Sequence, residues 1–98
     1  MAFKRWGHTF DGPWPNTDIL KPEPGIWVVW LRNPERWRVL EVGHSENVRH
    51  SLVERCTGFQ AAAGKEEIHY SVTYTPELSD DGRQEAAERI KRIARPGP

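Results

Sequence analysis

The segment from Gly25 to Val42, GIWVVWLRNPERWRVLEV, limits the possible folds of this chain more than any other. Its first apolar run, IWVVWL, is rich in branched and aromatic residues, which is typical of a strand covered on both faces. Turn-forming residues follow in RNPER, and WRVLEVG predicts a second strand. Because so short a connection favours antiparallel pairing, the segment predicts a β-hairpin. Simple alternation along the second strand predicts that Trp37, Val39 and Glu41 share one face.

Periodicity in the rest of the chain predicts two helices and a third strand. Apolar residues at helical spacing predict a helix over about 45–56, with Ser45 as its N-cap. The alternating sequence IHYSVTYT predicts a strand. The segment LSDDGRQEAAERIKRIARP predicts a final helix that is capped by Asp81 and ends before Pro96.

The first 24 residues are rich in proline and show neither helical nor strand periodicity. We therefore expect residues 1–24 to form an irregular strap, whose rings Trp6, Phe10 and Trp14 pack onto a domain at residues 25–96. The predicted fold is α/β in the broad sense (α+β). It is a small sandwich with a three-stranded, mostly antiparallel sheet flanked by helices, in the order β-β-α-β-α.

Composition excludes several classes of protein. Lysine and arginine total 14 and so do aspartate and glutamate, so no overall field attracts the chain to nucleic acid or to an anionic membrane. The single cysteine, Cys56, excludes an internal disulfide and favours a reducing compartment. No apolar run approaches the roughly 18 residues of a membrane span, and no signal-peptide core is visible. We therefore expect a cytoplasmic protein without membrane association.

Three motifs together resemble the GIY-YIG nuclease domain. They are GIW at Gly25–Trp27, EVGHS at Glu41–Ser45 and NVR at Asn47–Arg49. In that family a Gly-Ile-Tyr tripeptide opens one strand, a Tyr-Ile-Gly tripeptide ends the next, and a helix with an Asn-Leu-Arg-like start follows. The closing sequence ERIKRIARP is also similar to the family's last helix, so the resemblance covers roughly residues 25–96.

The resemblance implies phosphodiester hydrolysis. Family tyrosines help to activate water, an arginine on the first helix stabilises phosphate charge, and a glutamate on the last helix holds a divalent metal. In this sequence the two tyrosine positions are Trp27 and Glu41, and an indole donates hydrogen bonds but cannot act as a base. The arginine position falls on Ser51, and the glutamate position falls near Ala87, one residue before Glu88. The usual catalytic set is therefore absent.

The first hypothesis from this pattern is a binding domain. It keeps the GIY-YIG-like scaffold, lacks ordinary nuclease activity and needs no cofactor. It binds DNA, RNA or a protein partner through the former catalytic groove, with Trp27, Arg49 and His44 in its lining. The simultaneous loss of several catalytic roles favours this hypothesis, and the zero net charge favours a version in which the partner is a protein.

The second hypothesis is a metal-dependent endonuclease with a relocated active site. Ser51 and Arg55 lie one helical turn apart, so Arg55 can reach the phosphate position and Glu41 can supply a metal carboxylate. Glu41, Ser51 and Arg55 are then catalytic, and Glu41 or Glu88 binds Mg²⁺ or Mn²⁺. The simpler interpretation of Glu41 is a half-buried ion pair, for example with Arg55.

Basic residues gather towards the end of the last predicted helix, at Arg89, Lys91, Arg92 and Arg95. The helix dipole favours cations at this end, which explains them without a ligand. The alternative interpretation is a patch that contacts phosphate groups with salt-dependent affinity.

Overall fold

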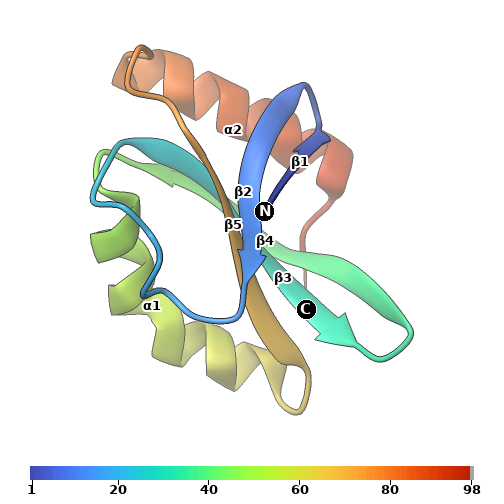
Figure 1. Ribbon diagram of the computed structural model, residues 1–98. Helices are drawn as coiled ribbons and strands as arrows, with labels where there is room; N and C mark the ends of the chain where they lie inside the picture. Colours follow the sequence, from blue (N-terminus) through green and yellow to red (C-terminus); the bar gives the residue numbers. More distant parts are fainter. Residues whose placement is uncertain (98) are drawn as a thin grey trace.

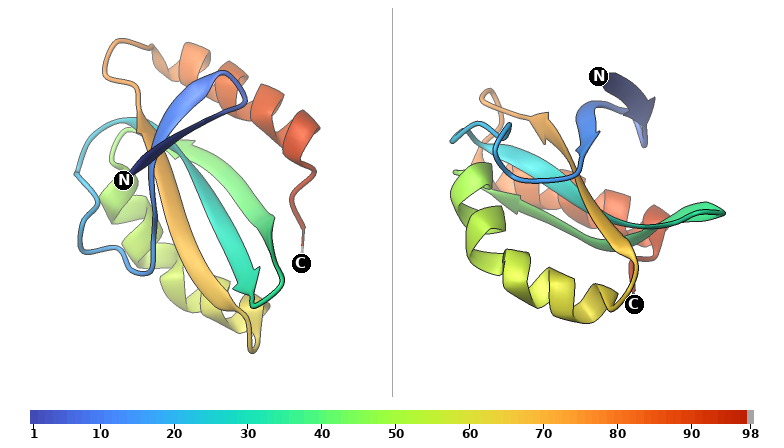
Figure 2. Two further views of the ribbon diagram at one scale, coloured as in Figure 1. Left: turned by 45° about the vertical axis from the view of Figure 1, so that its right-hand side comes forward. Right: turned by 60° about the horizontal axis from the view of Figure 1, so that its bottom comes forward.

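The computed structural model describes residues 1–97 and shows a small α+β domain (Figure 1). Its strands are β1 (Ala2–Arg5), β2 (His8–Trp14), β3 (Gly25–Asn33), β4 (Arg36–Ser45) and β5 (Glu67–Tyr74). Its helices are α1 (Val48–Ala63) and α2 (Asp80–Ala94). All five strands form one sheet in the order β1-β2-β5-β3-β4, with antiparallel neighbours throughout (Figure 2).

The predictions of an irregular strap at residues 1–24 and of a three-stranded sheet in the order β-β-α-β-α were wrong. Residues 2–14 form two strands that extend the sheet, so the element order is β-β-β-β-α-β-α. These strands have only four and seven residues, too few for alternation to stand out in the sequence. Their turn contains Trp6 and Gly7, both with positive φ, in place of the Asn-Gly pair that usually marks such a hairpin.

The β3–β4 hairpin is present as predicted, but a β-bulge changes the faces of β4. Val29 lies opposite Glu41, whereas the next residue, Trp30, lies opposite Val39, so Leu40 is the extra residue on β4. One inserted residue reverses the alternation of side chains beyond it. The prediction that Glu41 shares a face with Val39 was therefore wrong.

Two hydrophobic clusters lie on opposite faces of the sheet. The cluster under α2 contains Phe10, Ile26, Val28, Trp30, Val42, Ala86, Ala87 and Ile90. The cluster under α1 contains Leu20, Trp27, Val29, Val48, Leu52, Phe59, Tyr70 and Val72. Successive β3 residues alternate between the two clusters, which explains why the apolar run of β3 is continuous.

Helix α1 begins later and ends later than predicted. Asn47, not Ser45, is the N-cap, and its Oδ1 accepts a hydrogen bond from the backbone N–H of His50 at 3.0 Å. The helix continues through Gly58, which costs about 1 kcal/mol relative to alanine without breaking the helix. It ends at Gly64, whose φ of 62° suits glycine. Neither helix within residues 1–97 is long and apolar enough to cross a membrane.

Close packing at Gly43 yields a prediction for stability. The Trp27 ring lies directly against this glycine, and a Cβ added there would overlap the ring. Gly43→Ala should therefore destabilise the protein by about 1–3 kcal/mol in urea unfolding. In the control variant Gly58→Ala, the new Cβ meets no atom within 4 Å. This control should gain about 0.5–1 kcal/mol. Equal stability of Gly43→Ala and wild type would contradict the packing described.

Candidate functional site

An ion pair between Glu41 and Arg55 lies where the sequence predicted catalytic or metal-binding groups. Arg55 Nη2 donates to Glu41 Oε1 at 2.7 Å, and Arg55 Nη1 contacts the second oxygen, Oε2. The guanidinium group also lies over the Phe59 ring, 4.8 Å from its centroid. About a third of the Glu41 side chain is exposed (32%), and 48% of Arg55. The interpretation of Glu41 as half of an ion pair with Arg55 is thus confirmed, and both carboxylate oxygens are engaged.

Trp27 and His44 were predicted to line the former catalytic groove, but Trp27 is buried and His44 lies on the other face of the sheet from Glu41. Trp27 faces α1 but is only 4% exposed, so neither face of its ring is open to a base. Within residues 1–97 its indole N–H has no hydrogen-bond partner. His44 lies opposite Ile26, whose side chain belongs to the cluster under α2. Directly paired residues share a face of the sheet, so His44 lies on the side opposite Glu41.

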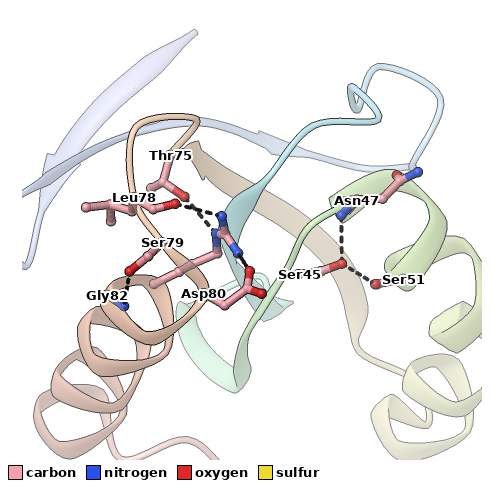
Figure 3. Close-up of polar contacts among 9 residues, drawn as sticks. Ser45, Asn47, Ser51, Thr75, Leu78, Ser79, Asp80 and Gly82 are labelled. Carbon is pink, nitrogen blue, oxygen red and sulfur yellow. Dashed lines mark hydrogen bonds and ion pairs between the residues drawn. The ribbon is translucent and has the colours of Figure 1, made fainter.

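Ser51 takes part in a hydrogen-bond network at the start of α1 (Figure 3). Its Oγ is 2.7 Å from Ser45 Oγ, which also accepts a hydrogen bond from the backbone N–H of Asn47 at 2.9 Å. These contacts hold the turn that leads from β4 into α1. They explain Ser51 as a structural residue, since no histidine or carboxylate is among its hydrogen-bond partners in the described chain.

The remaining predicted residues are not brought together with Glu41. Arg49 is exposed on the first turn of α1, beside Asn47 and His50. Glu88 lies on α2, across the sheet from α1, and pairs with Lys91 at 3.4 Å. Glu41 and Glu88 therefore cannot contribute to one site, and the alternatives proposed for a metal ligand are on separate faces.

A groove between α1 and β4 surrounds the Glu41–Arg55 pair, and we call it the α1–β4 groove. Its volume is about 490 Å³. Its lining consists of Leu40, Glu41, Glu54, Arg55, Gly58, Phe59 and Ala62. Leu40 supplies apolar surface, while the small residues Gly58 and Ala62 leave the helix side open. The arrangement can hold an apolar side chain beside polar groups, which is the usual composition of a ligand site.

The helical part of this groove was not predicted, because the predicted helix ended near Cys56 whereas α1 continues to Ala63. The signal was present, since Leu52, Cys56, Phe59 and Ala63 continue the helical spacing beyond Gly58. The segment after Cys56 was interpreted as a loop, although an isolated glycine such as Gly58 is tolerated within a helix.

A buried arginine, Arg83, was also missed and has a structural role. It is 4% exposed and donates hydrogen bonds to Thr75 Oγ1, Asp80 Oδ1 and the Leu78 carbonyl. Figure 3 labels these three acceptor residues. The hydrogen bond from Arg83 holds the pKa of Asp80 below its ordinary value. Ser79, not Asp81, is the N-cap of α2, so this cluster joins β5 to the helix.

The functional class cannot be read from known relatives. Within residues 1–97 no group of three or more histidine, cysteine, aspartate or glutamate side chains is arranged to hold a metal ion. Comparison of the chain with protein-family models, curated proteins and solved structures finds no match. The geometry of the side chains is therefore the basis for any functional proposal.

A second ion pair ties β4 to the turn before β5. Arg38 Nη2 donates to Glu66 Oε1 at 2.5 Å. This hydrogen bond is the main cause of a lowered pKa of Glu66, partly opposed by desolvation of the carboxylate. The pKa of Glu66 is lower in the folded state than in the unfolded state, where it is about 4.3. The ion pair therefore contributes its full stabilisation at pH values above the unfolded-state pKa. That contribution disappears as the pH falls through the folded-state pKa.

This linkage predicts how Glu66→Gln behaves in urea unfolding at a series of pH values. The variant should be less stable than wild type at pH 7, and the two stabilities should converge as the pH falls below about 4. Glu77→Gln removes an exposed loop carboxylate and serves as a control. The difference in stability between this control and wild type should not shrink in this way as the pH falls. A difference between Glu66→Gln and wild type that stays constant with pH would contradict the assignment.

Proposed function

We propose that this chain is a binding domain without ordinary nuclease activity, and that its α1–β4 groove receives a segment of a partner protein. The observation that carries the proposal is the two-point contact between Arg55 and Glu41. It engages the one carboxylate that a relocated nuclease site would need. The guanidinium group that would meet a phosphate is neutralised by the same contact.

The charge of the groove favours a protein over a nucleic acid as its ligand. Glu41 and Glu54 contribute two carboxylates and Arg55 one guanidinium group, so the lining has a formal charge of −1. Phosphate groups would be repelled by this surplus. An apolar side chain can cover the part-exposed Leu40. A neighbouring basic residue of the partner can approach Glu54, which is 64% exposed.

We further propose that the domain works in a reducing compartment such as the cytoplasm. Its only cysteine, Cys56, is half-buried in α1 and unpaired. A cysteine so placed behaves as a small apolar side chain and is best preserved where thiols stay reduced.

The groove can be tested with a library of displayed peptides selected on the wild-type protein. Gly58→Arg fills the groove and improves helix propensity, so the variant should remain folded. Peptides enriched on wild type should bind Gly58→Arg at least about tenfold more weakly, which corresponds to about 1.4 kcal/mol. Binding is measured by fluorescence anisotropy of the labelled peptides.

Gly58→Ala is the matched control, because it improves the helix without filling the groove. Selected peptides should bind Gly58→Ala as they bind wild type. Peptides that bind Gly58→Arg with unchanged affinity, or a selection that enriches no peptide sensitive to this substitution, would contradict the proposal.

A further inference from the structure

The face of the sheet opposite the α1–β4 groove carries a cluster of aromatic rings. Trp6 lies in the turn between β1 and β2, and neither strand is a neighbour of β3 in the sheet. Its ring nevertheless stacks on Trp30 of β3, with 5.8 Å between centroids and 16° between planes. Phe3 meets the same indole edge-on at 6.3 Å. On its other side Trp30 contacts Trp37 of β4, also at 6.3 Å. The β1–β2 hairpin therefore folds over this face beside α2.

Two hollows lie among these rings, with volumes of about 460 and 220 Å³. Both are lined by Arg5, Trp30 and Trp37, so they adjoin, and we call them together the Trp–Arg hollow. The other lining residues include Phe3, Trp6, Arg38 and Arg95. No acidic side chain lines it within the described chain, although acidic and basic residues balance in the sequence.

Two of the arginines in the hollow have guanidinium groups available to a ligand. Arg38 is held by Glu66, but neither Arg5 nor Arg95 forms an ion pair with any residue in the range 1–97. Arg5 lies over the Trp6 ring, 4.7 Å from its centroid, which orients its planar group within the hollow. The hollow thus combines flat rings with unpaired positive charge.

The backbone gives an independent sign that the side chains here are functional. Trp6 and Arg95 have φ values of 52° and 49°, and no other non-glycine residue in residues 1–97 has positive φ. Asparagine or glycine would fit the Trp6 turn better, and glycine is the preferred residue at the helix end where Arg95 lies. Both strained residues line the Trp–Arg hollow. Within residues 1–97, positive φ at non-glycine residues is thus confined to the lining of this one hollow.

We propose that the Trp–Arg hollow binds a single-stranded nucleic acid. An unpaired base stacks on Trp37, which is 41% exposed and has the Arg32 guanidinium group 5.4 Å from its ring centroid. Neighbouring phosphates contact Arg5 and Arg95. A duplex keeps its bases stacked inside and cannot offer them to the rings. An acidic peptide would satisfy the arginines but would leave the rings without flat partners. This inference is independent of the α1–β4 groove, which lies on the other face.

The test uses fluorescence anisotropy with a labelled single strand of about 12 nucleotides, within the range that small single-strand-binding domains cover. DNA and RNA strands are compared with a duplex and with polyglutamate. Single strands should bind more tightly than either, and affinity should fall as salt rises from about 50 to 200 mM. A DNA strand bound as tightly as RNA indicates contact through bases and phosphates, and tighter RNA binding adds the 2′-hydroxyl; either result supports the proposal.

Substitutions separate binding from folding. Trp37→Ala should weaken single-strand binding about tenfold or more, whereas Trp37→Phe keeps a ring and should retain most of the affinity. Arg95→Gly should weaken binding several-fold and reduce the salt dependence, while leaving stability unchanged or higher because glycine suits the left-handed helix end. Arg49→Ala removes an exposed cation on α1, on the other face of the sheet, and should not affect single-strand binding.

Three results would overturn the proposal. The first is the absence of salt-sensitive binding of either single strand. The second is binding that survives both Trp37→Ala and Arg95→Gly. The third is polyglutamate or duplex bound as tightly as the single strands, because the hollow would then recognise charge alone.

Discussion

The burial of β3 on both faces is the constraint on which the rest of the structure depends. Its seven residues from Gly25 to Leu31 are all buried, and the strand is paired with β4 on one side and β5 on the other. Its alternate side chains then need a cover on each face, which α1 and α2 provide. The N-terminal hairpin completes the cover over Trp30, because α2 leaves that part of the face open.

This two-sided arrangement separates the chemistry of the domain into two surfaces. Glu41 and Arg55 lie on the α1 face, and their exposure is too high for the pair to contribute more than about 0.2–1 kcal/mol to stability. Its main effect is therefore on the groove, where it neutralises a carboxylate and a guanidinium group at once. The Trp–Arg hollow is on the α2 face and keeps its positive charge, because Arg5 and Arg95 face no carboxylate in the described residues.

Sequence reasoning succeeded where a local pattern decided the structure. The apolar run of β3 and the short turn after it were sufficient to predict the hairpin. The helical spacing after Ser45 predicted a helix that places Arg55 near Glu41. It failed where one residue or a distant contact decided the outcome. The bulge at Leu40 has no local signal, and Gly58 resembled a helix end. The stacking of Trp6 on Trp30 joins the turn between β1 and β2 to β3, which pairs with neither strand, so the aromatic surface could not be predicted from periodicity.

The most direct test of the account is nicking of supercoiled plasmid by the wild-type protein in the presence of Mg²⁺ or Mn²⁺, with Glu41→Ala beside it. We expect no metal-dependent nicking by either protein, because Arg55 engages both oxygens of Glu41. Nicking by the wild type that is lost in Glu41→Ala would contradict it, and would show that the carboxylate leaves its ion pair to serve a relocated nuclease site.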